Sequence, residues 1–298
     1  YKVKHSLHSN TIYALKVFHE SVHASSVMDE YQALRDIAHP NIVKFVWNGT
    51  LPTGQFFTLM EFLDGENLKD YAKGEKRLPI HRVYQVSKDI LSALVVMQDK
   101  QPALFHRDIK PQNIVFDNEE RFVLIDFNVA SALEGNKEHV GTHPYLAPDL
   151  VADGYKVNWD KSADPFALAI TLYELACKVY PWNGSIKMPQ LDKAPTYPKE
   201  INPNLSKQFA DFLFKAIQPK AEDRFATAKD MLSALELIGE NNILEADAAS
   251  AQVNLSKSEI PSDGDFVSYI NSLFSQSRHG NAGTRAGAKD NPYDELTY

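Results

Sequence analysis

The hydrophobic residues of the first sixty positions gather in short runs separated by turn residues. Three runs, at 12–18, 42–47 and 56–60, are rich in β-branched and aromatic residues, which favours strands. Between the first two, hydrophobic residues recur at helical spacing and stop before His39-Pro40, where proline cannot continue a helix; they are Val27, Tyr31, Leu34 and Ile37. This part is predicted to be a small sheet that carries one helix.

After Leu63-Asp64-Gly65 the pattern becomes helical. One long apolar stripe comprises Val83, Val86, Ile90, Leu91, Leu94 and Met97. Two strand-like pieces, 114–116 and 122–125, are joined by a polar turn, and helical patterns resume at 166–176, 207–217 and 228–238. A larger, mainly helical lobe is therefore expected.

From about residue 245 the chain is rich in Ser, Asn, Asp and Gly, with one short amphipathic stretch at 266–274. We place a domain boundary near 240. Residues 1–240 form one domain, with a small lobe at 1–60 and a larger lobe at 64–240. Residues 241–298 are expected to be a polar, partly ordered extension.

The composition disfavours nucleic acid and membrane as partners and indicates a reducing compartment. The 298 residues are enough to bury a real core, and 31 basic against 39 acidic residues give a net charge of −8, which disfavours direct nucleic-acid binding. The single Cys177 excludes a disulfide framework and fits a reducing compartment. No apolar run is long enough to span a bilayer, so we expect a cytoplasmic protein without membrane association.

Candidate chemistry lies in two segments of the larger lobe. The first runs from His106 to Asn113 (HRDIKPQN), and the second begins at Asp126, thirteen residues after Asn113. A strand-turn-strand returns its ends to neighbouring positions, so the oxygens of Asn113 and Asp126 can converge on Mg²⁺. Asp108 is then free to deprotonate a hydroxyl nucleophile. Lys110, two residues further along an extended segment, shares its face and can neutralise a transferred phosphoryl group.

These segments resemble the catalytic loop and metal-binding motif of the eukaryotic-type serine/threonine protein kinase family. Seven motifs follow the family's order over residues 1 to about 240. Lys16, in the string YALK, resembles the strand lysine of the family, and Glu30 its helix partner. MEFL at 60–63 resembles the hinge, and the segment 141–149 (GTHPYLAPD) resembles the end of the activation segment.

The resemblance implies an α+β, bilobal fold with ATP and Mg²⁺ bound between the lobes. Catalytic roles fall to Asp108, Lys110 and Asn113, and the metal ligands are Asn113 and Asp126. The remaining nucleotide-binding residues that it implies are Ala14, Lys16, Glu30, Met60, Glu61 and Leu63. Met60 guards the back of the pocket, and residues 61–63 offer backbone groups to adenine. Asp164 anchors the catalytic loop, and Arg224 pairs with Asp149.

Lys110 and Thr142 imply a protein substrate bearing Ser or Thr. Two other functions remain open. A pseudokinase or nucleotide-binding scaffold is favoured by Asn128, which stands where the family has Gly, and by the lack of a glycine-rich loop. A small-molecule kinase is disfavoured by the polypeptide platform that residues 142–149 and Arg224 imply. Two further departures are Asp149 in place of Glu, with its pair to Arg224 expected to persist, and a proline one place late at Pro144.

Arg107 precedes the catalytic aspartate, and in the family such an arginine receives a phosphate from the activation loop. The stretch 132–140 contains no Ser, Thr or Tyr. One hypothesis is that Glu134 or Glu138 supplies a fixed carboxylate to Arg107. The alternative is that both are solvated loop acids.

No glycine precedes Gly49, so the phosphate-covering glycine loop of the family is expected upstream of Tyr1. Residues 275–285 are similar to a segment that follows the kinase domain in some large bacterial kinases linked to phage defence. Both features suggest a part of a larger multidomain protein.

Overall fold

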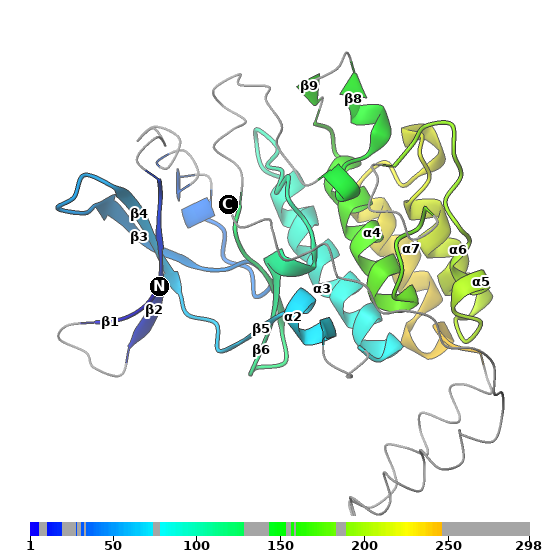
Figure 1. Cartoon of the computed structure of the whole chain (residues 1–298), viewed down its shortest axis with the longest axis horizontal. Helices are drawn as coiled ribbons and strands as arrows, with labels where there is room; N and C mark the ends of the chain where they lie inside the picture. Colours follow the sequence, from blue (N-terminus) through cyan, green and yellow to red (C-terminus); the bar gives the residue numbers. More distant parts are fainter. Residues whose placement is uncertain are drawn as a thin grey trace, which may run out of the picture. The chain divides into compact units, whose positions relative to one another are not determined.

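The computed structural model describes residues 1–5, 11–19, 28, 31–32, 34–73, 78–127, 143–152, 156–157, 159–182 and 189–245. These residues fall within one compact unit, 1–248. A blue, strand-rich part and a cyan-to-yellow helical part make it up (Figure 1). The predicted stretch at 266–274 and the similarity at 275–285 lie outside the described residues.

The small part is a four-stranded antiparallel sheet. Its strands are β1 (Lys2–Lys4), β2 (Ile12–Val17), β3 (Phe45–Thr50) and β4 (Phe56–Glu61), in the order β1-β2-β4-β3. The register places Ala14 opposite Met60 and Lys16 opposite Thr58, so the predicted nucleotide-contacting residues of β2 and β4 are neighbours. The predicted strands at 12–18 and 56–60 are confirmed.

The strand expected at 42–47 is wrong at its start, because β3 begins only at Phe45. Residues 41–43 bond instead to the helical part: Leu124 donates its backbone N–H to the Asn41 carbonyl (2.9 Å), and Val43 donates to the Leu124 carbonyl (3.0 Å). The start of the apolar run therefore bonds to β7, and its end forms β3 of the first sheet.

The helix predicted before His39-Pro40 is present. Residues 31, 32, 34 and 35 are helical, and Leu34 and Ile37 are buried. The helix ends before Pro40, as expected from the clash of the proline ring with a continuing helix. Leu34, Ile37 and the partly buried Tyr31 join the core, while Gln32 and Arg35 are exposed.

The larger part contains α2 (Leu68–Lys73), α3 (Ile80–Gln98), α4 (Ala163–Cys177), α5 (Pro198–Ile201), α6 (Lys207–Ala216) and α7 (Ala228–Ile238). The predicted helices at 166–176, 207–217 and 228–238 correspond to α4, α6 and α7. All six residues of the apolar stripe on α3 are fully buried. Helix α4 is buried on nearly every side, which makes it the centre of the helical core.

A second antiparallel sheet lies beside the helices, in the order β5-β6-β7. Its strands are β5 (Gly65–Asn67), β6 (Ile114–Asp117) and β7 (Phe122–Leu124). Gly65 is required here, because a Cβ at this position would lie 2.1 Å from the Phe116 carbonyl oxygen. A short ribbon, β8 (Val151–Ala152) with β9 (Lys156–Val157), was not predicted.

The end of the described chain packs against α6. Ser206 donates its N–H to the Ile243 carbonyl (3.0 Å), Leu205 and Leu244 form an isolated bridge, and Ile243 is buried. The domain boundary near 240 stays a prediction.

No helix among the described residues is long and apolar enough to cross a membrane.

Candidate active site

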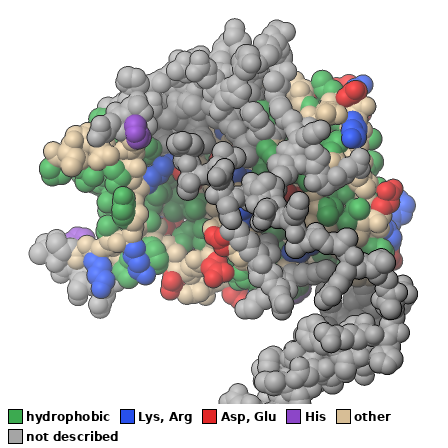
Figure 2. Space-filling view, viewed as in Figure 1, with side chains coloured by type: hydrophobic (Ala, Val, Ile, Leu, Met, Phe, Trp, Pro, Cys, Tyr) green, Lys and Arg blue, Asp and Glu red, His purple; other side chains and the backbone are tan. Residues whose placement is uncertain are grey.

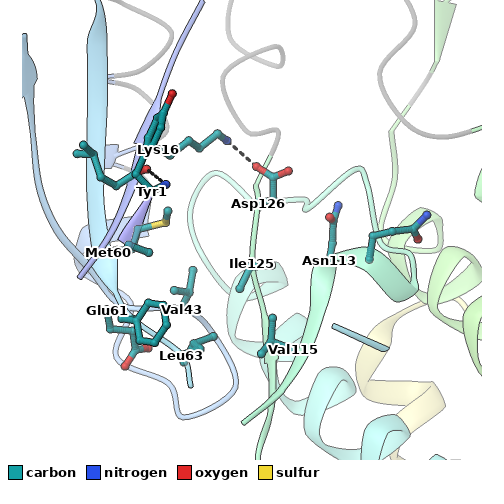
Figure 3. A pocket seen from close by; sticks show the side chains of 14 residues that line it. Tyr1, Lys16, Val43, Met60, Glu61, Leu63, Asn113, Val115, Ile125 and Asp126 are labelled. Carbon is teal, nitrogen blue, oxygen red and sulfur yellow. Dashed lines mark hydrogen bonds and ion pairs between the residues drawn. The ribbon is translucent and has the colours of Figure 1, made fainter. Parts of the chain in front are cut away.

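A cavity of about 480 Å³ opens between the two parts. The molecular surface is hollowed there, and hydrophobic side chains are visible inside the hollow (Figure 2). Seven residues predicted from the sequence line it: Ala14, Lys16, Met60, Glu61, Leu63, Asn113 and Asp126. The apolar and polar side chains of the cavity are seen in Figure 3. Phe62, which also lines the cavity, falls within the segment 61–63 predicted to contact adenine. The sequence reasoning missed the remaining lining residues, Tyr1, Leu15, Val43, Gln112, Val115 and Ile125.

The strand pattern could have located one of the missed residues, because Val115 alternates with Asn113 along the chain. It could not have located Ile125, because alternation places consecutive residues such as Ile125 and Asp126 on opposite faces. Val43 reaches the cavity because its segment joins β7 instead of continuing β3. Only the tertiary hydrogen bonds of that segment reveal it.

Lys16 and Asp126 meet across the cavity. The Lys16 ammonium lies 2.6 Å from Asp126 Oδ1, with the two side chains 30% and 49% exposed (Figure 3). Burial would raise the pKa of Asp126, but the charge and hydrogen bond of Lys16 outweigh burial and lower the pKa. Glu30, the predicted partner of Lys16, lies outside the described residues.

The hairpin of β6 and β7 brings Asn113 and Asp126 to one end, as predicted. Ile114 pairs with Leu124, and Ile125 donates its N–H to the Asn113 carbonyl at 3.0 Å. The Asp126 backbone is left-handed (φ 61°), so the chain turns away from the direction of strand β7 at this residue. Both side chains line the cavity.

The loop before this hairpin gathers Asp108, Lys110 and Asn113. Asp108 is 9% exposed, and its Oδ2 lies 2.8 Å from the Lys110 ammonium. The Asn113 side-chain amide donates to Asp108 Oδ2 (3.0 Å) and to the Asp108 carbonyl (2.8 Å). Since both amide protons of Asn113 are used, its Oδ1 is the atom suited to a cation.

Asp164, at the start of α4, anchors this loop from below. Its two carboxylate oxygens accept the backbone N–H groups of His106 (2.7 Å) and Arg107 (2.9 Å). Arg107 is held with φ 71°, a conformation that costs energy for a residue with a Cβ. Burial raises the pKa of Asp164, against these hydrogen bonds and the charge of the neighbouring Arg107. Asp164 therefore makes the contacts that the anchoring role implied by the resemblance requires.

His106 connects the loop to the chain just before Asp126. Burial lowers its pKa, so the ring is neutral at pH 7. Its Nε2 lies 3.0 Å from the Ile125 carbonyl and its Nδ1 lies 3.3 Å from the Asp108 N–H, which assigns the proton to Nε2. The His106 ring also packs 4.5 Å from that of Phe127, the residue after Asp126. Asn128 lies outside the described residues.

The segment after the cavity is held at Asp149. The Arg224 guanidinium nitrogen Nη2 donates to both Asp149 oxygens, at 2.8 and 2.7 Å, so the expected pair persists with the shorter acid. Arg107 lies with its guanidinium carbon 5.5 Å from the centre of the Trp159 ring. Thr142, Glu134 and Glu138 lie outside the described residues, so the carboxylate hypothesis for Arg107 stays a prediction.

The donor chemistry fits a magnesium ion. A carboxylate at Asp126 and an amide oxygen at Asn113 are hard oxygen ligands, and both line the cavity beside a lysine. Among the described residues, no three His, Cys, Asp or Glu side chains cluster in a way that could hold a metal ion by themselves. Two protein ligands are what Mg²⁺ uses where substrate phosphates complete its shell.

Residues 1–235 match the protein kinase domain family. PrkC of Bacillus subtilis, a serine/threonine-protein kinase, is 29% identical over 68% of this chain and 32% of its own length. MasK of Myxococcus xanthus, a tyrosine-protein kinase, is 32% identical over 70% of this chain and 34% of its own. The chain thus spans about a third of the length of these curated relatives.

Solved structures agree with this match. The kinase domain of Mycobacterium tuberculosis PknI is 25% identical, with a TM-score of 0.59 over 80% of this chain and 89% of that one. The Cydia pomonella granulovirus kinase PK-1, 18% identical, has a TM-score of 0.61 over 76% of this chain and 85% of its own. The chain belongs to the protein kinase domain family, and the predicted bilobal α+β fold is confirmed.

Proposed function

We propose that this protein transfers the γ-phosphoryl group of ATP to a Ser or Thr hydroxyl of a polypeptide, with Mg²⁺ as the metal. The observation that carries the proposal is the convergence of Lys16, Asn113 and Asp126 in one cavity, next to the pair formed by Asp108 and Lys110. Belonging to the kinase family supports the reaction class. PrkC, a relative described as a serine/threonine kinase, supports the choice of acceptor.

The adenine would lie among the apolar residues of the cavity. Met60 and Leu63 would contact the base, and the backbone at 61–63 would supply hydrogen bonds. Ala14 lies opposite Met60 across the sheet, so the two confine the base from adjacent strands. The apolar walls exclude water, which strengthens every charge interaction at the phosphate end.

Lys16 would bind the α- and β-phosphates. In the structure it pairs with Asp126, so nucleotide binding places phosphate oxygens where the ammonium can serve both. Glu30 is proposed to hold the other side of Lys16. Asn113 and Asp126 would hold Mg²⁺, which when bound neutralises charge that develops on the transferring phosphoryl group.

Asp108 would receive the proton of the acceptor hydroxyl. The new bond joins the hydroxyl oxygen to the γ-phosphorus, the bond from that phosphorus to the bridging oxygen breaks, and ADP leaves. Asn113 orients the Asp108 carboxylate through its amide, and the Lys110 ammonium balances charge on the transferred group. We also propose a cytoplasmic location, in keeping with the free, buried thiol of Cys177.

The test is magnesium-dependent transfer of labelled γ-phosphate to a degenerate library of Ser- and Thr-containing peptides. Asp108→Asn is the control, because it keeps the shape of the side chain and removes its basicity. Labelling by the wild type alone supports the proposal. Equal labelling by both proteins, or binding of Mg-ATP without labelling of any peptide or protein, refutes it. The second outcome is that of a nucleotide-binding scaffold.

A further inference from the structure

The segment Tyr180-Pro181-Trp182 follows α4, and from its sequence it is explained by packing alone. In the structure the Tyr180 hydroxyl donates to the Pro144 carbonyl oxygen at 2.6 Å, and Tyr180 is 6% exposed. Pro144 lies in the 3₁₀ turn His143–Tyr145, 36 residues earlier in the chain. A ring that only filled space would not need this hydroxyl, since phenylalanine has the same apolar surface.

The Tyr180 ring is fixed from behind. The Pro181 carbonyl accepts the Thr196 N–H (2.7 Å), and the buried Trp182 indole donates to the Lys193 carbonyl (2.8 Å). The rings of Tyr180 and Trp182 lie 5.5 Å apart. The hydroxyl therefore projects from a rigid frame, and its hydrogen bond defines where the Pro144 carbonyl can lie.

The same turn has a second anchor on α4. The Tyr145 hydroxyl donates to Glu174 Oε2 at 2.7 Å. Burial, and then the Glu174 carboxylate, raise the pKa of Tyr180, so its hydroxyl is a protonated donor at neutral pH. Two hydroxyl donors, one to the turn and one from it, thus fix both the backbone and a side chain of residues 143–145.

This turn adjoins the proposed catalytic base. Tyr145 and Leu146 line a small cavity together with Arg107, Asp108 and Ile109, so the turn lies next to the catalytic loop. A polypeptide that presents its hydroxyl to Asp108 must then pass close to Tyr145 and Leu146. Residues next to the phosphoacceptor would then contact the backbone that Tyr180 holds.

We propose that Tyr180 is a positioning residue for the polypeptide substrate: its hydroxyl fixes the turn 143–145 that receives the residues beside the phosphoacceptor. The inference rests on the proposed kinase function. It assigns a defined task to the segment 180–182 and to the late proline at Pro144, whose carbonyl is the accepting group.

The test compares Tyr180→Phe with Ser87→Ala. Ser87 is the control, because it is also buried and its hydroxyl also donates to a backbone carbonyl, that of Val83 within α3 (2.7 Å). Both variants lose one buried hydrogen bond from a hydroxyl to a backbone carbonyl, so both melting temperatures should fall. The substrates are Mg-ATP and a position-fixed library of Ser and Thr peptides.

For Tyr180→Phe the KM for peptide should rise about 3- to 10-fold, the change expected for one hydrogen bond. The preference for the residue after the phosphoacceptor should broaden, while the KM for ATP stays within about 2-fold of wild type. Ser87→Ala should leave both KM values and the peptide preference unchanged.

If Tyr180→Phe matches wild type in peptide KM and preference, the inference is wrong. It is equally wrong if both variants shift peptide and ATP KM together, since Tyr180 would then act only on stability. Failure of the wild type itself to label any peptide would overturn the proposed function, and this inference with it.

Discussion

Lys16 and Asp126 are 110 residues apart in the chain, and their side chains meet at 2.6 Å across the cavity. One comes from the sheet of the small part and the other from the end of the β6–β7 hairpin. The contact joins the proposed phosphate-binding group to a proposed metal ligand. Substituting Lys16 therefore tests whether this contact serves phosphate binding or the stability of the fold.

Replacing Lys16 by Met should lower phosphotransfer about 100-fold or more, because a charged group aimed at the transferring phosphates is lost. The free energy of unfolding should change by no more than about 1 kcal/mol, since the pair is partly exposed. Steady-state kinetics and urea unfolding measure the two effects. Lys4→Met, at an exposed position on β1, is the control and should change neither. A loss of activity that is explained by a matching loss of unfolding free energy would contradict the proposed role of Lys16 in phosphate binding.

The anchoring of the catalytic loop predicts a compensating pair of substitutions. Asp164→Asn removes one of two hydrogen bonds from backbone N–H groups to a buried carboxylate, and should cost roughly 2–4 kcal/mol of unfolding free energy. Arg107 is held with φ 71°, which glycine adopts freely. The same substitution should therefore cost less in an Arg107→Gly background. A double-mutant cycle from urea unfolding tests this, and strictly additive effects would show that Asp164 does not maintain the strained backbone.

The sequence predicts most of this fold because the informative signals are local. The stripe on α3, the β6–β7 hairpin and the proline that ends the first helix each follow from spacing or from one residue's geometry. The start of β3 and the presence of Val43 in the cavity depend on hydrogen bonds from residues 41–43 to Leu124, more than 80 residues later. No periodicity within 42–47 distinguishes those partners from a strand of the first sheet. The hydrogen bond from Tyr180 to Pro144 could not be predicted either, because it also joins residues far apart in the chain.

The segment at 41–43 predicts a substitution that affects the cavity from a distance. Buried Asn41 donates its side-chain amide to the Phe122 carbonyl at 2.9 Å, two residues before Leu124 and four before Asp126. Asn41→Ala should cost about 1–3 kcal/mol of stability and weaken Mg-ATP binding, because the strand that carries Asp126 loses a constraint. Calorimetric titration with Mg-ATP measures the second effect.

Asn202→Ala is the matched control for Asn41→Ala. Its amide donates to the Ala176 carbonyl, also at 2.9 Å, and neither residue lines the nucleotide cavity. It should lower stability by a similar amount and leave the Kd for Mg-ATP unchanged. Equal Kd values for both variants would mean that the 41–43 segment is structural only.

Glu174 predicts a pH dependence of stability with a defined sign. Burial raises its pKa, against the Tyr145 hydroxyl and the charge of Lys69. Between the unfolded value of about 4.3 and the raised folded pKa, the native state binds more protons than the unfolded state. The contribution of Glu174 to stability is therefore full below about pH 4 and is lost as pH rises through the folded pKa. Glutamine at this position keeps an acceptor for Tyr145 and does not titrate.

The unfolding free energy of Glu174→Gln minus that of wild type should accordingly increase from about pH 4 to about pH 7, by about 1.4 kcal/mol for each unit by which the folded pKa is raised. Urea unfolding at several pH values across this range measures the difference, and all other titrating groups cancel in it. Glu222→Gln, at an exposed position before Arg224, should give a difference that stays flat with pH. A flat difference for Glu174→Gln as well would mean that its carboxylate is solvated, and would remove the buried acceptor on which the second anchor of the turn 143–145 depends.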